Sequence, residues 1–162
     1  MSGILQSGGI TPGHMARWTT DGVIQDGGGW PVGQRVLASL RGANFNTTGD
    51  QPIVVPNNIT AFQLTGIVVT NSAVSLTTAQ GGFYPQAAKG GTPIVAAAQV
   101  YSALSSATAL LQATITSFGQ NTRFSAANLG SVAGLLAIWL SLTTPQGLTA
   151  TADAYLIGVD LT

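Results

Sequence analysis

The sequence contains one short phrase twice, and each copy closes an apolar run. Residues 75–81 read SLTTAQG and residues 141–147 read SLTTPQG, after the apolar stretches 67–70 and 135–140. An apolar stretch of this length that ends in a turn rich in threonine and glycine is typical of a buried β-strand. Two such units predict a pair of sheets.

Other strands are predicted where apolar segments lie between turn residues. Residues 61–70 predict a long central strand. Residues 43–47 and 51–55 lie on either side of Thr48-Gly49-Asp50, and this spacing is typical of a hairpin. Residues 109–116 alternate with period two, which predicts one more strand.

The C-terminal stretch 151–161 also alternates. Asp153 and Tyr155 fall on one face, and Ala152 and Ala154 fall on the other. This stretch is expected to return antiparallel, as the hairpin partner of the preceding apolar run.

Residues 92–104 leave two alternatives open. Thr92 is suited to cap a helix with Pro93 in its first turn, and Ile94, Ala97, Tyr101 and Leu104 would then share one face. A strand followed by a helical turn fits the same residues equally well.

About eight short strands with few or no helices predict an all-β fold, and a jelly-roll-like two-sheet sandwich fits them best. An immunoglobulin-type sandwich is the second choice, because its cysteine and tryptophan signature is absent. The sandwich is expected over residues 35–162. Residues 1–34 are rich in glycine and predict an extended N-terminal arm.

Charge is scarce in this chain of 162 residues. Charged residues make up 6%, hydrophobic residues make up 45%, and the net charge is zero, whereas about 25% of residues are charged in an ordinary soluble domain. No basic field is present to hold nucleic acid or an anionic membrane surface. Much of the surface is therefore expected to be covered by copies of the chain or by a larger assembly.

Two sets of residues are candidates for such contacts. Residues 135–142 are apolar on both faces of the predicted strand, so Leu136, Ile138 and Leu140 are expected at a strand-face interface. The arm has too few large side chains for a core of its own, but indoles gain much when they are buried on a partner. The arm residues expected at an interface are Arg17, Trp18, Val23, Ile24 and Trp30.

Membrane insertion and secretion are not expected. The longest apolar run, residues 132–142, is about half of the roughly 20 residues that a membrane span needs. The first nine residues lack a basic start and an apolar centre, so synthesis in a cytoplasm is expected. The absence of cysteine rules out disulfides and thiolate metal sites.

No pattern predicts catalysis, a cofactor or a metal ion. His14 is the only histidine, and the sequence has no G-x-S-x-G nucleophile elbow with which it could act as a general base, so a hydrolase is not expected. Asp153 and Asp160 are an odd number of residues apart on a strand, so they face opposite sides and cannot flank one glycosidic bond. The larger aromatic residues are expected in the core or at an interface, with a sugar-binding platform as the lesser alternative: Tyr84, Tyr101, Trp139 and Tyr155.

The N-terminal residues carry a resemblance to a known group of proteins. Residues 11–14 (TPGH) and 18–27 (WTTDGVIQDG) resemble the N-terminal signature of small virion proteins of tailed bacteriophages and prophages, which are called head fibres, tail proteins or decoration proteins. Residues 67–84, the second SLTT copy and residues 151–153 resemble the β-sandwich portion of the same proteins.

The resemblance implies a structural protein. The closest role is that of a decoration (cement) protein on the capsid surface, which associates with itself and with the phage major capsid protein after synthesis in the host cytoplasm. A head- or tail-fibre attachment module is an alternative, although no coiled-coil heptads follow the arm. A carbohydrate-binding module is another alternative.

Overall fold

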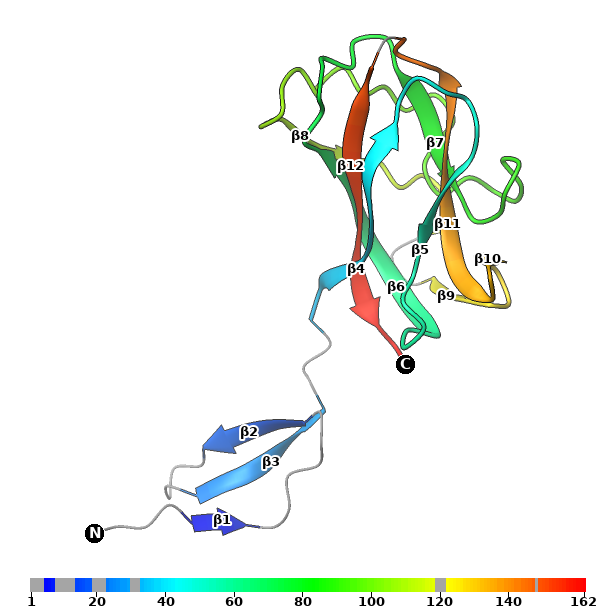
Figure 1. Cartoon of the computed structure of the whole chain (residues 1–162). Helices are drawn as coiled ribbons and strands as arrows, with labels where there is room; N and C mark the ends of the chain where they lie inside the picture. Colours follow the sequence, from blue (N-terminus) through cyan, green and yellow to red (C-terminus); the bar gives the residue numbers. More distant parts are fainter. Residues whose placement is uncertain (1–4, 8–13, 19–22, 30–32, 119–121, 148) are drawn as a thin grey trace. The chain divides into compact units, whose positions relative to one another are not determined.

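The computed structural model describes residues 5–7, 14–18, 23–29, 33–118, 122–147 and 149–162. The chain divides into two units, Met1–Gly33 and Gln34–Thr162. The described residues contain strands and no helix, and the second unit has two antiparallel sheets that pack face to face (Figure 1). The predicted all-β, two-sheet sandwich is therefore confirmed.

The larger sheet of the sandwich has β12 and β6 at its centre. Its strands are β4 (Arg35–Asn44), β12 (Thr151–Asp160), β6 (Ala61–Thr70), β8 (Leu110–Ala113) and β9 (Arg123–Ser125). Strands β8 and β9 both pair with β6, β8 along residues 67–70 and β9 along residues 61–63. The predicted central strand over residues 61–70 is thus confirmed.

The smaller sheet is built around β11. Its strands are β5 (Gln51–Val54), β11 (Leu135–Thr144), β10 (Gly130–Val132) and β7 (Gln80–Tyr84). All of its pairings are antiparallel, and β5, β7 and β10 each pair directly with β11.

The core lies between the two sheets. Side chains such as Ile67 and Val69 of β6 and Ile138 and Leu140 of β11 are completely buried. Burying an aliphatic side chain of this size stabilises a fold by about 1.5–3 kcal/mol. Because the chain has no cysteine, packing and hydrogen bonds hold the sandwich together without disulfides.

Both predicted hairpins are wrong, because the chain crosses between the sheets at each of them. Strand β4 pairs with β12 and β5 pairs with β11, while β12 also pairs with β6 rather than with β11. At the first crossing the Gln51 side chain accepts from Asn44 N (2.6 Å) and donates to Asn44 O (2.7 Å). The amide replaces the strand partner that Asn44 would have had in a hairpin.

The helix considered for residues 92–104 is not present. This segment runs beside β7, with bridges from Val95 to Phe83 and to Ile115 and from Val100 to Gln80. Two short turns occur instead, where Gln99 N donates to Ala96 O (3.0 Å) and Leu104 N donates to Tyr101 O (2.8 Å). In a helix the backbone groups of this segment would hydrogen-bond to one another. Here they hydrogen-bond to the edge of β7 that does not pair with β11.

The two copies of the repeated phrase contact one another. Gln146 Oε1 of the second copy accepts from Thr78 N (2.9 Å) and Ala79 N (3.2 Å) of the first copy, and also from Thr78 Oγ1 (3.1 Å). Strand pairing brings Leu142 opposite Gly81 in the same region. The two copies therefore join the residues just before β7 to the residues just after β11.

The first unit contains a sheet of its own where the sequence predicts an extended arm. Its strands are β1 (Leu5–Ser7), β3 (Val23–Gly29) and β2 (His14–Trp18), in that spatial order. Strand β1 is parallel to β3, and β2 is antiparallel to β3. The glycines within β3 do not prevent pairing.

Replacement of Gln146 tests the contact between the repeated phrases. Gln146→Ala removes the acceptor for two backbone N–H groups, and Ala79 is almost fully buried. We expect a loss of about 1–3 kcal/mol in the free energy of unfolding, measured by urea titration. Gln80→Ala, at the matching position of the first copy, is the control. Equal losses in the two variants would contradict the assigned role of Gln146.

Gly158 tests the packing of β12 against β6. A Cβ at this position would lie 2.1 Å from the Gln63 carbonyl oxygen and 2.7 Å from Leu37 Cδ1. Because backbone must move to relieve such a contact, Gly158→Ala should destabilise the sandwich by about 3 kcal/mol. The control is Gly66→Ala, whose Cβ would be in ordinary contact, 3.5 Å from Gln112 Nε2. A thermal midpoint for Gly158→Ala as high as that of the control would refute the packing argument.

Candidate functional site

A hollow lies on the described surface of the sandwich, beside the middle of β6. Strand β8 begins its pairing with β6 at Ile67, and β9 ends its pairing at Gln63. Both strands lie on the same side of β6, since β12 occupies the other side. Residues 64–66 are therefore left without a strand partner on this side within the described part of the chain.

The chain that follows β8 turns away from β6 and encloses the hollow. Ile115 forms a bridge with Val95 instead of continuing the ladder along β6. The result is a half-open groove of about 360 Å³ between β6 and residues 112–118. Its lining residues are Leu64, Thr65, Gly66, Gln112, Ala113, Thr114, Ile115 and Phe118.

A β-bulge lies at the centre of the groove. The register of β12 on β6 shifts between Ile157, opposite Gly66, and Gly158, opposite Leu64, so Thr65 is the extra residue. Its hydroxyl donates to Ile157 O (3.2 Å), which fixes the bulge to β12. Bulges disrupt a ladder locally and reorient neighbouring groups, and they occur often beside binding sites.

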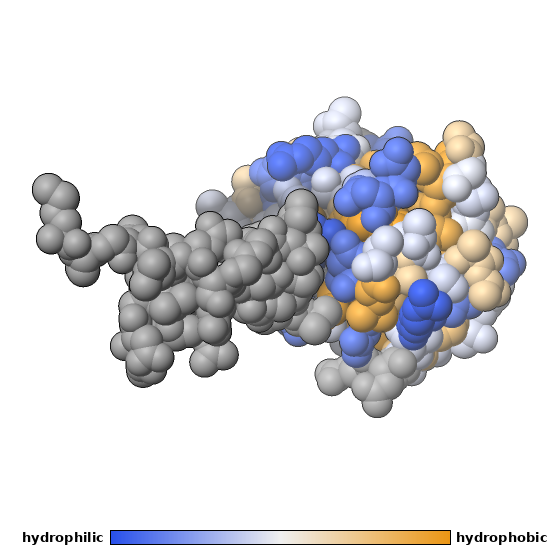
Figure 2. Space-filling model, turned by 90° about the horizontal axis from the view of Figure 1, so that it is seen from below, coloured by the Kyte–Doolittle hydropathy of each residue, from blue (hydrophilic) through white to orange (hydrophobic). Residues whose placement is uncertain are grey.

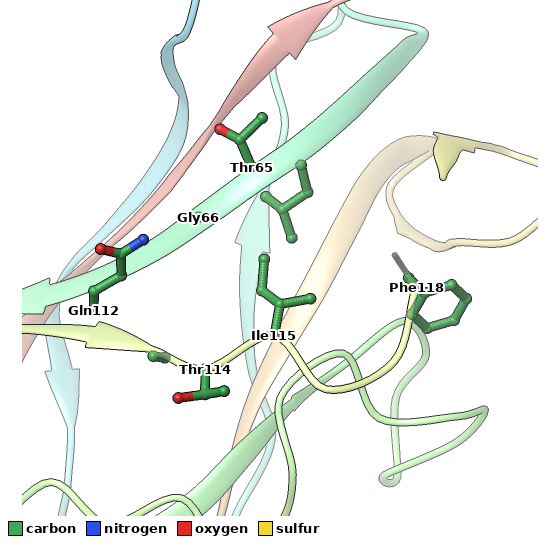
Figure 3. A pocket seen from close by; sticks show the side chains of 8 residues that line it. Thr65, Gly66, Gln112, Thr114, Ile115 and Phe118 are labelled. Atoms are coloured by element: carbon green, nitrogen blue, oxygen red, sulfur yellow. The ribbon is translucent and has the colours of Figure 1, made fainter. Parts of the chain in front are cut away.

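The groove combines uncharged polar groups with an apolar wall. Gln112 contributes an amide and Thr114 a hydroxyl, and both residues are exposed. Gln112 and Phe118 lie toward opposite ends of the groove, with Ile115 between them (Figure 3). No lining side chain is charged or able to act as a general base, so the arrangement is suited to binding a neutral polar molecule.

A second polar cluster surrounds Asp153, a buried residue of β12 at the point where the pairing with β4 is interrupted by a bulge. Its carboxylate accepts from Gly42 N (2.7 Å), Asn71 Nδ2 (3.2 Å) and the Tyr155 hydroxyl (3.4 Å). Gly42 has φ +63 and lies at a bulge of β4, where its N–H is turned away from the ladder and toward the carboxylate. Asp153 therefore stabilises a backbone irregularity.

The pKa of Asp153 lies below its ordinary value. Burial raises the pKa, but the hydrogen bonds from Gly42, Asn71 and Tyr155 and the positive charge of Arg41 more than offset this effect. Asp160 is engaged separately, by an ion pair with Arg35 and by a hydrogen bond from Thr162 N (3.0 Å). Each of the two carboxylates thus has structural partners of its own.

The predicted strand-face interface needs a correction. Leu136, Ile138 and Leu140 are buried in the core of their own chain. The opposite face of β11 is covered too, since Ala137, Trp139 and Ser141 are buried and the Ser141 hydroxyl donates to Thr48 O (3.3 Å). Both apolar faces of β11 are thus buried within one chain, because loops cover the face that is turned away from the other sheet.

The aromatic residues considered for a sugar platform are mostly inaccessible. Tyr84, Tyr101 and Trp139 are buried. The pKa of Tyr101 is raised, mainly by burial and to a smaller extent by the nearby Tyr84. Tyr101 donates to Gly81 O (3.2 Å) and packs edge-on against Phe45. Tyr155 is half-buried beneath Arg41, whose guanidinium lies 5.9 Å from the ring centroid. These four residues form no exposed platform.

The structure brings most of the predicted arm residues together in one pair of strands. Arg17 lies opposite Gln25 and Trp18 lies opposite Ile24, where β2 pairs with β3. Val23 precedes Ile24 at the start of β3. Trp30 lies outside the described residues.

The groove was not predicted from the sequence. The alternation over residues 109–116 predicts only a strand, and the structure confirms it for Leu110–Ala113 (β8) and not for Thr114. The groove forms because the pairing of β8 with β6 ends at Ala113. The pairing ends there because Ile115 forms a bridge with Val95 instead. No local pattern encodes that bridge.

Hydropathy is mixed on the face of the second unit that Figure 2 shows. Figure 2 shows one end of this unit, where hydrophobic and hydrophilic residues are interspersed. Within the described ranges, no helix has the length and hydropathy to cross a membrane. Among the same residues, no cluster of three or more His, Cys, Asp or Glu is placed to hold a metal ion.

Comparison of the chain with protein-family models, with curated proteins and with solved structures finds no match. The features from which a function can be inferred are therefore the groove, the Asp153 cluster and the paired strands β2 and β3.

Acidification tests the Asp153 cluster. A carboxylate whose pKa is lowered by folding contributes stability above its unfolded pKa of about 3.9, and this contribution is lost as the pH falls through the folded value. Asp153→Asn should therefore destabilise the protein by about 1–3 kcal/mol near neutral pH, and the difference should shrink toward about pH 3.

The matched control for this measurement is Asp160→Asn. Asp160 forms an ion pair with the half-exposed Arg35, so its replacement should cost less than about 1 kcal/mol. Urea unfolding curves recorded across the acidic range compare the two variants with the parent. If the Asp153→Asn variant and the parent lose stability in parallel on acidification, the cluster does not have the assigned role.

Proposed function

We propose that this chain is a structural protein of a tailed-phage virion, a decoration protein that associates with itself and stabilises the capsid shell by binding neighbouring major capsid subunits. The observation that carries the proposal is the location of the virion-protein signature. Of that signature, His14 and Trp18 fall on β2 and residues 23–27 fall on β3, and the two strands pair in a unit separate from the sandwich. A decoration protein needs a part that attaches it to the shell and a part that covers the shell, and a chain with two units can provide both.

The sandwich has the properties of a rigid covering unit. In the described residues every buried side-chain nitrogen and oxygen has a hydrogen-bond partner. Both faces of β11 are occupied within the chain, so the unit does not need a partner to complete its core. Such a unit can retain its structure both free and on a shell.

The scarcity of charge also supports a role in close assembly. Five basic and five acidic residues occur in the whole chain, and of these Arg35 and Asp160 are paired and Asp153 is buried. Copies packed side by side would therefore repel one another little, and their association would change little with salt.

The residues expected to contact the shell or a neighbouring copy are those of the first unit: Arg17, Trp18, Val23, Ile24 and Trp30. The core location of Leu136, Ile138 and Leu140 leaves this ribbon as the main candidate. Aromatic residues and arginine supply most of the binding energy at protein interfaces, and leucine supplies it less often.

The test is to locate the chain on purified virions and to replace both indoles of the first unit. In the full chain, Trp18→Ala with Trp30→Ala should weaken binding to capsids by at least about tenfold, because burial of one indole contributes on the order of 2 kcal/mol. Co-sedimentation with capsids gives the affinity, and electron cryomicroscopy gives the location.

The matched control is Val36→Ala, which truncates a side chain of the sandwich that is 54% exposed. It should bind capsids like the parent, and all variants should keep the thermal transition of the sandwich. Density on the tail instead of the head would assign the chain as an attachment module. Absence from virions, or capsid binding unaffected by loss of both indoles, would refute the proposal.

A further inference from the structure

The unpaired middle of β6 is the least explained part of the sandwich. Within an antiparallel ladder, alternate residues direct both N–H and C=O toward the same neighbour. Residues 64–66 have no strand partner on the β8 side in the described part of the chain, so the backbone groups of this stretch that do not pair with β12 border the groove. Backbone groups in a partly buried position pair with water or with a ligand that offers matching donors and acceptors.

Side chains add matching groups to this open edge. Gln112 extends from the opposite side of the groove toward Gly66, while Thr114 lies at the rim with its side chain directed away from β6 (Figure 3). The structure gives the Gln112 amide and the Thr114 hydroxyl no partner among the described residues. Together they offer donors and acceptors without formal charge. A charged ligand would find no opposite charge here, so the preferred occupant is neutral.

The far end of the groove offers an apolar surface. Phe118 is half-buried and its ring lies 5.3 Å from that of Phe124, which in turn stacks on Phe62 at 5.5 Å. Ile115 lies beside Gln112 and Phe118 in the groove (Figure 3). Because Phe118 packs against Phe124, which is itself held by Phe62, it offers a preformed surface, and preformed surfaces lose little entropy when a ligand binds.

The ends of the groove exclude a long peptide. Strands β8 and β9 lie on the same side of β6 and flank the gap, so an added strand of more than three residues would overlap one of them. Three residues of strand span about 10 Å, and the groove holds about 360 Å³. This space suits a compact molecule near the lower limit of small-molecule pockets, about 300–1,000 Å³.

We propose that the groove formed by Leu64, Thr65, Gly66, Gln112, Thr114, Ile115 and Phe118 binds a neutral sugar ring. A sugar ring has hydroxyl groups around its rim, which pair with the β6 backbone and Gln112, and an apolar face, which packs on Phe118 and Ile115. The site is independent of virion attachment, which is assigned to the first unit. A decoration protein with this site would present a glycan receptor on the particle surface.

The experiment is a titration of the ¹⁵N-labelled full chain, followed by amide shifts in two-dimensional NMR spectra. The probes are glucose, galactose, mannose and N-acetylglucosamine, with N-acetylneuraminic acid as the charged comparison. At least one neutral sugar should shift the amides of Thr65, Gly66, Gln112 and Thr114, and the charged sugar should not.

Two variants test the location, and a third is the control. Gln112→Ala removes the amide and should weaken binding about tenfold. Gly66→Ala places a methyl group 3.5 Å from Gln112 Nε2, within the groove, and should weaken binding while the fold is retained. Gln86→Ala removes an exposed amide from a loop outside the groove and should leave the affinity unchanged.

Three outcomes would overturn the proposal. In the first, none of the four neutral sugars shifts the groove amides at millimolar concentration. In the second, the shifts fall elsewhere on the chain or survive both groove variants. In the third, the groove amides respond to the capped tripeptide N-acetyl-trialanine amide and not to the sugars, which would assign the groove to an extended peptide. None of these outcomes bears on capsid binding, which is measured separately.

Discussion

The sandwich depends on the burial of β11 on both of its faces. One face, with Ile138 and Leu140, fills the space between the sheets, and the other is closed by loops, one of which supplies Thr48 O to the Ser141 hydroxyl. A strand covered on both faces reads as a continuous apolar run. The same burial removes an apolar surface that would otherwise require a partner, so the sandwich is complete as a single chain.

The second constraint is the division of one edge of β6 between β8 and β9. Two short strands hold the ends of β6, and the chain between them leaves the sheet to reach Val95 on the other side of the core. This detour links the two sheets, but it leaves the middle of β6 without a partner and opens the groove. The groove is thus a consequence of how the sandwich closes along this side.

The two units divide the proposed tasks between them. In the proposal the sandwich, whose buried polar side-chain atoms all have hydrogen-bond partners among the described residues, is the covering unit. The ribbon β2–β3 carries the indole and arginine expected at a contact. Polar interactions inside the sandwich are specific and local. Gln51, Gln146 and Asp153 each replace a missing backbone partner where the chain crosses between sheets or bulges.

The sequence by itself determined several strands of the sandwich, since period two and apolar runs are local properties: residues 61–70 and 110–113 are strands as expected. It did not indicate the three strands of the first unit, where glycine masks any such pattern. Only the tertiary structure decided the partners. Residues 43–55 and 135–161 have hairpin-like spacing, but their strands belong to different sheets. Likewise, the apolar pattern around Leu136 is the same for a core and for an interface, and Gln112 lies in a groove only because Ile115 bonds with Val95. Pairing depends on the whole set of competing edges and on where each side chain finds cover, and neither is contained in a local pattern.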